Sequence, residues 1–232
     1  MAIQNRTTSL PVSVQHTPRS ARSPAHFRSL ALADVDVEAL RIAGAWVVTP
    51  RQHIDERGTF LEWFRADLLE AATGRPFAVR QANHSVSSRG SLRGVHFADV
   101  PPGQAKLVYC PRGAILDVVV DVRVGSPTYG DHVAVRLDDV DRRYVFISEG
   151  LGHAFVALDD DTSVTYLTSS TYDPAVERAV APLDPALALP WPADLGEPGL
   201  GELRLSAKDA AAPTLAEARA GGLLPRYDAC PH

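Results

Sequence analysis

The sequence predicts an all-β domain arranged as a sandwich or a barrel. Along most of its 232 residues, short stretches rich in Val, Ile, Leu, Phe and Tyr alternate with Gly, Pro, Asp and Ser. This pattern is typical of many short strands joined by turns. Turn signals occur at residues 55–58, 101–103, 125–127 and 149–150. The sequence has no internal repeat, so we expect a single domain over residues 37–225.

The apolar stretches give the expected strands. They cover residues 44–49, 59–65, 77–85, 106–110, 114–122, 131–137, 143–147, 154–158 and 163–168. We also expect two short helices, one over residues 66–72 and one that starts near Thr214 and ends at Gly221 and Gly222. Residues 184–203 are rich in Pro and Gly, and we expect them to pack irregularly over the β domain.

The two ends of the chain differ from this domain. Residues 1–36 carry arginines among Ser, Thr and Pro, and their first acidic residue is Asp34. They lack the compact apolar stretch of a secretory signal. We expect an N-terminal extension with little structure and a C-terminal tail over residues 226–232.

Composition and charge exclude several classes of protein. The net charge is −5, and nothing suggests the basic face of a nucleic-acid-binding protein. No apolar run approaches the roughly 20 residues of a membrane helix. Cys110 and Cys230 are the only cysteines, and their spacing suits neither a disulfide framework nor a CxxC motif. We therefore expect a cytoplasmic protein without nucleic-acid or membrane partners.

Lysine is rare in this sequence. Only Lys106 and Lys208 are lysines among 23 basic residues. Where arginine is the default, a retained lysine indicates a site that needs a compact ammonium group. Chance explains the same count equally well, so both interpretations stay open at this point.

Two histidines beside glycines are candidates for acid–base chemistry. His96 lies two residues after Gly94, and His153 directly follows Gly152. Glycines allow a ligand or a second backbone to approach closely. Histidine has an ordinary pKa of about 6.5, which suits proton transfer near neutral pH. The alternative is that each is a hydrogen-bonded structural histidine.

Sequence motifs for metals and nucleotide cofactors are missing. A metal-binding H-x-H pair is absent, because Phe97 and Ala98 follow His96. The sequence has no G-x-x-x-x-G-K-[ST] loop and no strand-led G-x-G-x-x-G loop. We therefore expect chemistry that needs no metal, no ATP and no NAD.

A set of motifs in a fixed order resembles a known family. The motifs occupy residues 55–62, 81–85, 90–97, 101–106, 116–130, 149–155, 166–168 and 205–209. Together they resemble the dTDP-4-dehydrorhamnose 3,5-epimerase family, especially its antibiotic-deoxysugar branch, over about residues 38–220. The resemblance implies a cupin-type double-stranded β-helix (jelly roll) with a few short peripheral helices. It also implies a homodimer and a dTDP-sugar substrate.

The resemblance assigns roles to individual residues. His96 falls at the family's catalytic base, Asp209 at the aspartate that pairs with it, and Tyr166 at the general acid. Lys106 falls near the keto oxygen of the substrate. The positions that match substrate contacts are Arg57, Glu62, Gln81, Asn83, Arg93, His153, Glu177 and Lys208, and weaker candidates for packing on the nucleotide base are Phe60 and Tyr172.

These roles fit an epimerisation beside a ketone. His96 would remove the proton, and Lys106 would stabilise the enolate oxygen at C4. Asp209 would fix the tautomer of the histidine. Tyr166 would return a proton on the opposite face if nearby cations lower its pKa. No redox cofactor is needed, because the substrate arrives already oxidised at C4.

Departures from the family pattern leave the regiochemistry open between C3, C5 and both. The family often has Tyr where this chain has Phe97 and Lys where it has Leu167. Strand alternation would also place Arg93 and His96 on opposite faces, unless Gly94 creates a bulge. The alternatives are a 3-epimerase on a related keto sugar, a metal-dependent cupin enzyme, and a non-catalytic sugar-nucleotide binder.

Overall fold

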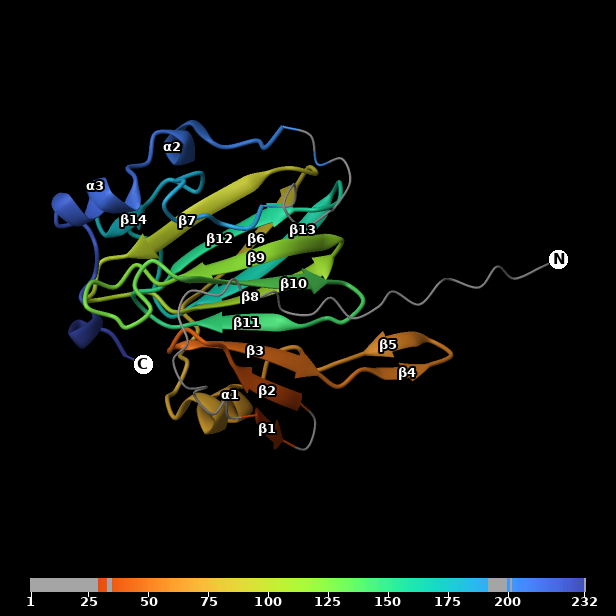
Figure 1. Cartoon of the computed structure of the whole chain (residues 1–232). Helices are drawn as coiled ribbons and strands as arrows, with labels where there is room; N and C mark the ends of the chain where they lie inside the picture. The colour runs from red at the N-terminus through yellow and green to blue at the C-terminus, as the bar shows by residue number, and fades with distance from the viewer. Residues whose placement is uncertain (1–28, 33–34, 192–199, 201, 232) are drawn as a thin grey trace, which may run out of the picture.

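Two antiparallel sheets face each other in the computed structural model, which describes residues 29–32, 35–191, 200 and 202–231 (Figure 1). The seven-stranded sheet has the order β1 (Ser29–Leu32), β2 (Val35–Ala39), β3 (Ala45–Pro50), β11 (Tyr144–Ile147), β8 (Lys106–Arg112), β13 (Thr162–Thr168) and β6 (Gln81–Ser87). The five-stranded sheet has the order β10 (His132–Asp138), β9 (Ala114–Val120), β12 (Gly152–Ala157), β7 (Leu92–Ala98) and β14 (Glu177–Ala179). Between β7 and β13 the chain passes repeatedly from one sheet to the other, which is the jelly-roll arrangement that was predicted.

The remaining elements are peripheral. Strands β4 (His53–Asp55) and β5 (Gly58–Phe60) form a separate hairpin that extends away from the two sheets (Figure 1). The helices are α1 (Ala66–Thr73), α2 (Ala207–Ala210), α3 (Leu215–Ala220) and the 3₁₀ turn η1 (Tyr227–Ala229). No helix in the described part of the chain is long and apolar enough to span a membrane.

The main core lies between the two sheets. Val108 on β8, Val119 on β9 and Val164 on β13 belong to one buried cluster. The outer face of the five-stranded sheet is covered by residues 187–191 and α3, and the outer face of the seven-stranded sheet is covered by α1. Because both of its faces are covered, β9 is buried at every residue, as its nearly continuous apolar sequence indicates.

A β-bulge in β7 sets the direction of two candidate site residues. His96 pairs with His153, and Arg93 pairs with Phe155, so two residues of β7 oppose one residue of β12 between these pairs. The extra residue brings Arg93 and His96, three positions apart, to the same face of the sheet. Both line one cavity, as the expectation of a bulge required.

Gly94 makes this bulge sterically possible. Its φ of +117° is a backbone conformation that favours glycine. A Cβ at this position would lie 2.5 Å from the carbonyl oxygen of His153 and 2.6 Å from the Cα of Ala154. No side chain fits there, so β7 approaches β12 closely only because residue 94 is glycine.

Two predicted strands have the wrong boundaries. The strand expected at 59–65 ends at Phe60, and the strand expected at 77–85 begins only at Gln81. The apolar residues outside these strands are buried for another reason. Trp63 stacks on Tyr109, and the ring of Phe77 packs edge-on against Phe146, both in the cluster under α1.

Both ends of the described chain are hydrogen-bonded to the rest of the domain. Residues 29–32 and 35–39 form paired strands, so the expectation of little structure up to residue 36 is wrong for 29–32 and 35–36. Residues 1–28 and 33–34 lie outside the described residues. At the other end, the backbone N–H of Tyr227 donates to Val124, and Cys230 is buried. Residues 184–191 pack irregularly as predicted, with Leu187 buried, whereas 192–199 and 201 lie outside the described part.

Candidate active site

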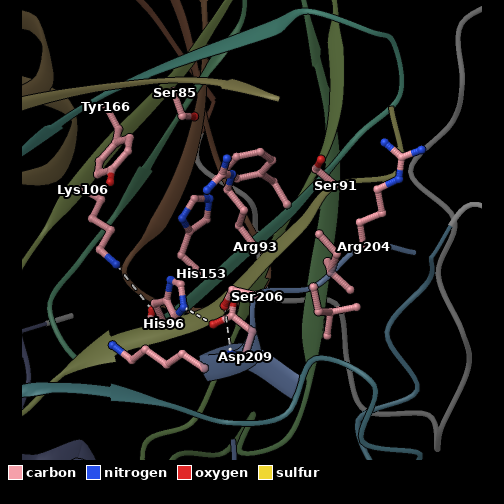
Figure 2. A pocket seen from close by; sticks show the side chains of 14 residues that line it. Ser85, Ser91, Arg93, His96, Lys106, His153, Tyr166, Arg204, Ser206 and Asp209 are labelled. Atoms are coloured by element: carbon pink, nitrogen blue, oxygen red, sulfur yellow. Dashed lines mark hydrogen bonds and ion pairs between the residues drawn. The ribbon is translucent and has the colours of Figure 1, made fainter. Parts of the chain in front are cut away.

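A cavity of about 470 Å³ lies between the inner faces of the two sheets. The seven-stranded sheet contributes Ser85, Lys106 and Tyr166 to its wall. The five-stranded sheet contributes Leu92, Arg93, His96, His153 and Phe155, and Ser91 lies just before β7. Residues 204–206 and 208–209, which lead into and include α2, complete the lining. Side chains that are far apart in the sequence therefore converge on one space (Figure 2).

His96 and Asp209 form a hydrogen-bonded pair in this cavity. His96 Nε2 lies 2.6 Å from Asp209 Oδ1 (Figure 2). The His96 side chain is 33% exposed and that of Asp209 only 5%, so the imidazole faces the cavity and the carboxylate stands behind it. When Nε2 donates its proton to Asp209, the other ring nitrogen is free to accept a proton from a bound molecule.

The N-terminus of α2 fixes the position of Asp209. Ser206 is the N-cap of this helix, and its Oγ accepts a hydrogen bond from the backbone N–H of Asp209 at 3.0 Å. Burial alone would raise the pKa of Asp209. The interactions with His96, with the Ser206 side chain and with the backbone N–H of Gly94 outweigh burial and leave the pKa of Asp209 below its ordinary value. Asp209 is therefore a carboxylate at neutral pH.

Lys106 places an ammonium group beside this pair. The residue is 7% exposed, and its Nζ donates to the backbone oxygen of His96 at 3.4 Å. Burial lowers the pKa of Lys106, while the negative charges of Glu177 and Asp117 act in the opposite direction. A buried cation next to the histidine is suited to stabilising negative charge that develops on a bound molecule.

Tyr166 lines the wall opposite the His96–Asp209 pair, next to Ser85 (Figure 2). The condition that nearby cations lower its pKa is not met. Burial raises the pKa of Tyr166, the charge of Glu177 raises it further, and only Arg93 acts to lower it. The desolvation of the phenol outweighs the single cation, so Tyr166 stays a neutral hydroxyl and can donate a proton.

A second histidine–carboxylate pair was not predicted. His153 Nε2 lies 2.6 Å from Asp117 Oδ2, and Asp117 is fully buried. The sequence did contain a signal for this pair, because Asp117 is the only charged residue within the apolar strand β9. His153 lines the cavity, so Asp117 holds a cavity-lining histidine from behind.

Of the expected substrate-binding residues, three line the cavity. These are Arg93, His153 and Lys208. Arg93 Nε donates to Ser87 Oγ at 3.2 Å, which holds its guanidinium along β6. Sequence reasoning missed Ser85, Arg204 and Ser206 as lining residues. Ser85 could have been found, because it follows Gln81 and Asn83 at alternate positions of β6 and so shares their face.

The other expected substrate-binding residues do not line the cavity. They are Arg57, Phe60, Glu62, Gln81, Asn83, Tyr172 and Glu177. Gln81 donates to Asn83 Oδ1 at 2.7 Å and accepts from the backbone N–H of Tyr172 at 2.8 Å, so these three form one group. Glu177 is near enough to act on Lys106 and Tyr166.

The β4–β5 hairpin, which carries Arg57 and Phe60, extends away from the two sheets. Glu62 follows this hairpin. The side chain of Arg57 is 86% exposed, and Phe60 is 67% exposed. Ile54 on the same hairpin is 77% exposed, so the hairpin presents two large apolar side chains to solvent. The roles of these residues stay predictions.

The described residues offer no ready metal site. Within them, no group of three or more His, Cys, Asp and Glu side chains is placed to hold a metal ion. His96 and His153 each contact a single carboxylate, Asp209 and Asp117 respectively. Cys110 and Cys230 are both buried thiols.

The fold and the cavity together define a jelly-roll enzyme of the acid–base type, with a histidine–aspartate pair, a lysine and a tyrosine around one space. Residues 39–217 match the family model described as dTDP-4-dehydrorhamnose 3,5-epimerase. This chain belongs to that family.

The relatives at high identity include 3-epimerases and 3,5-epimerases. The chain is 56% identical over 191 residues to a dTDP-4-dehydrorhamnose 3-epimerase of Streptomyces niveus, covering 82% of this chain and 89% of the relative. It is also 56% identical over 191 residues to a dTDP-4-dehydrorhamnose 3,5-epimerase of Mycolicibacterium smegmatis, covering 82% and 91%. A solved structure of a 3′-monoepimerase from Streptomyces bikiniensis in complex with dTDP-quinovose has a TM-score of 0.77 at 50% identity, covering 82% of this chain and 93% of that one.

Proposed function

We propose that this protein is an epimerase of a dTDP-4-keto-6-deoxyhexose, which inverts a stereocentre beside the ketone without a bound cofactor. The observation that carries the proposal is the arrangement of His96 and Asp209 on one side of the cavity and Tyr166 on the other (Figure 2). Inversion needs a base and an acid on opposite faces of the same carbon. The names of the relatives support the same reaction.

The first step is removal of a proton beside the ketone. The free ring nitrogen of His96 takes the proton, and the electron pair of the broken C–H bond moves toward the C4 oxygen to form an enolate. Asp209 stabilises the imidazolium that results. Lys106 stabilises the enolate oxygen; in a low-dielectric cavity this preorganised charge is worth more than in water.

The second step returns a proton on the other face. Tyr166 gives its phenolic proton to the carbon, and the electron pair returns from the enolate oxygen to restore the ketone. The raised pKa of Tyr166 keeps the hydroxyl protonated until this step. His96 and Tyr166 then return to their starting protonation states by exchange with solvent, so the reaction needs no oxidant and no reductant.

The cations of the cavity suit a nucleotide-linked sugar. Arg93, Lys106 and Lys208 line this space, and the only carboxylate among its described lining residues, Asp209, is engaged with His96. The protein as a whole is acidic, with a net charge of −5. This local excess of positive charge favours a diphosphate group, and a solved relative was crystallised with dTDP-quinovose.

We further propose a homodimer in which the β4–β5 hairpin reaches the cavity of the partner. Arg57 and Phe60 are exposed on an arm that extends away from the body of their own chain (Figure 1). Co-expression of His96→Ala and Arg57→Ala chains tests this. If the hairpin acts in the partner, mixed dimers contain one site with both substitutions and one intact site, and they recover activity that neither variant has alone. No recovery would mean that Arg57 does not act across an interface.

The test of the proposed reaction is incubation with dTDP-4-keto-6-deoxyglucose in D₂O, followed by NMR of the sugar protons. Epimerisation requires deuterium at the inverted carbon. Deuterium at C3 and C5 would identify a 3,5-epimerase, and deuterium at C3 alone would identify a 3-epimerase, the alternative that the Streptomyces niveus relative favours. No deuterium at either position would refute the proposed activity on this substrate.

A further inference from the structure

Ser85 is a cavity residue to which the mechanism above gives no role. It lies on β6, where it pairs with Val164 of β13 and shares a face with Asn83. Asn83 in turn pairs with Tyr166. Ser85 therefore lies one step further along the same inner face as the tyrosine. Figure 2 shows it on the wall that faces His96 and Asp209.

The hydroxyl of Ser85 has no hydrogen-bond partner among the residues that the structure describes. Its Oγ is buried, and no hydrogen bond reaches it within the described part of the chain. Most buried hydroxyls are hydrogen-bonded, because leaving one unpaired costs folding free energy. The next residue on this face, Ser87, follows the usual rule, since its Oγ accepts from Arg93. An unpaired hydroxyl in the wall of a substrate cavity therefore calls for a partner that enters with the substrate.

Ser85 as a residue is only partly buried and lines the cavity, although its Oγ is closed off. A serine side chain has three staggered positions of Oγ. Rotation about the Cα–Cβ bond is therefore sufficient to turn the hydroxyl from the closed position toward the cavity.

We propose that Ser85 Oγ turns into the cavity when the sugar binds and hydrogen-bonds an oxygen of the sugar on the face that Tyr166 protonates. This inference rests on the proposed function and adds a residue that orients the sugar. Ser85 then holds the sugar against the wall that carries the acid, with His96 on the opposite side. The nucleotide needs no contact with Ser85.

The test compares Ser85→Ala with the wild type and with a matched control. Ser148 also has a buried Oγ without a partner among the described residues, but it does not line the cavity. For Ser85→Ala we expect kcat/KM for dTDP-4-keto-6-deoxyglucose to fall about tenfold, the effect of one hydrogen bond. The Kd of dTDP alone, which lacks the sugar, should stay the same. The Tm of the variant should be equal to that of the wild type or higher. Ser148→Ala should leave kcat/KM unchanged, and Ser85→Thr, which keeps a hydroxyl, should recover most of the loss.

Three results would overturn the inference. An unchanged kcat/KM in Ser85→Ala would mean that the hydroxyl does not meet the substrate. An equal loss of dTDP affinity would mean that it acts on the nucleotide. A lower Tm would mean that Ser85 has a structural partner in the free protein. If the wild type itself exchanges no proton of the keto sugar, the proposed function fails, and this inference fails with it. If the wild type is active and Ser85→Ala is equally active, only the role of Ser85 is refuted.

Discussion

His96 Nε2 and Asp209 Oδ1 lie 2.6 Å apart although the two residues are 113 positions apart in the chain. The histidine comes from β7, and the aspartate comes from α2, a four-residue helix. The contact between α2 and β7 therefore fixes the tautomer of a histidine in the cavity, because it places a carboxylate beside the ring.

Asp209→Asn should slow epimerisation about 10²-fold or more, because the amide cannot stabilise the imidazolium and allows the wrong tautomer of His96. The measurement is kcat with the keto sugar. Ser206→Ala serves as a control, since it removes the cap of α2 but keeps the carboxylate. A smaller loss in Ser206→Ala than in Asp209→Asn is expected; equal losses would mean that Asp209 acts only through the position of the helix.

Tyr166→Phe should separate proton removal from inversion. His96 and Lys106 remain, so we expect deuterium from D₂O to enter the sugar, while the rate of inversion falls by about 10²- to 10⁴-fold, the range typical of a lost general acid. NMR of the sugar recovered after partial reaction gives both quantities. A parallel fall of exchange and inversion would argue against a role limited to the second proton transfer.

Glu177→Gln should move the alkaline limb of the pH–rate profile to lower pH. The charge of Glu177 raises the pKa of both Lys106 and Tyr166. Without that charge, both groups lose their protons at lower pH, and the protonated forms are the active ones in this mechanism. Profiles of kcat/KM against pH measure the shift. Glu70→Gln, on the exposed side of α1, is the control and should leave the limb in place.

Asp121→Ala should lower the free energy of unfolding strongly. Asp121 pairs with Arg123 at 2.8 Å, and both side chains are fully buried. Removing the carboxylate leaves a buried cation unpaired, which typically costs about 3–5 kcal/mol. Urea unfolding measures the loss. Asp228→Ala, which breaks an exposed pair with Arg226, should change stability little, and a similar loss in both variants would contradict the role of burial.

The same pair predicts acid sensitivity of the wild type. Burial alone would raise the pKa of Asp121, but Arg123 and the hydroxyls of Ser126 and Thr128 outweigh it and lower the pKa below its ordinary value. A lowered pKa in the folded state means that the stabilisation is complete above the ordinary value of 3.8 and is lost as pH falls below it. Unfolding free energy should therefore decline below about pH 4 in the wild type.

The family resemblance predicted the jelly roll and half of the residues that line the cavity. Periodic apolar residues define most of the strands, and the motif order identifies His96, Lys106, Tyr166 and Asp209, which all line one cavity. Alternation indicated that Arg93 and His96 could share a face only with a bulge at Gly94, and the structure has a bulge there. Apolar periodicity and short motifs are therefore sufficient to predict features that depend on one strand alone.

Features that depend on distant packing were missed. Trp63 and Phe77 look like strand residues, but they are apolar because they pack under α1. The raised pKa of Tyr166 depends on burial and on Glu177, which comes from another strand. The roles of Asp117 and Ser85 depend on how β9 and β6 are placed around the cavity. Asp117 supports His153, and Ser85 lines the cavity with a buried hydroxyl that has no partner among the described residues.

The most direct test of the account is proton exchange catalysed by His96→Asn compared with the wild type. Both proteins are incubated with dTDP-4-keto-6-deoxyglucose in D₂O, and deuterium at C3 and C5 is measured by NMR. Asparagine keeps a polar side chain in the cavity but cannot act as a base near neutral pH. We expect exchange in the wild type and a loss of at least about 10²-fold in the variant. Exchange at the wild-type rate in His96→Asn would contradict the assignment of His96 as the base.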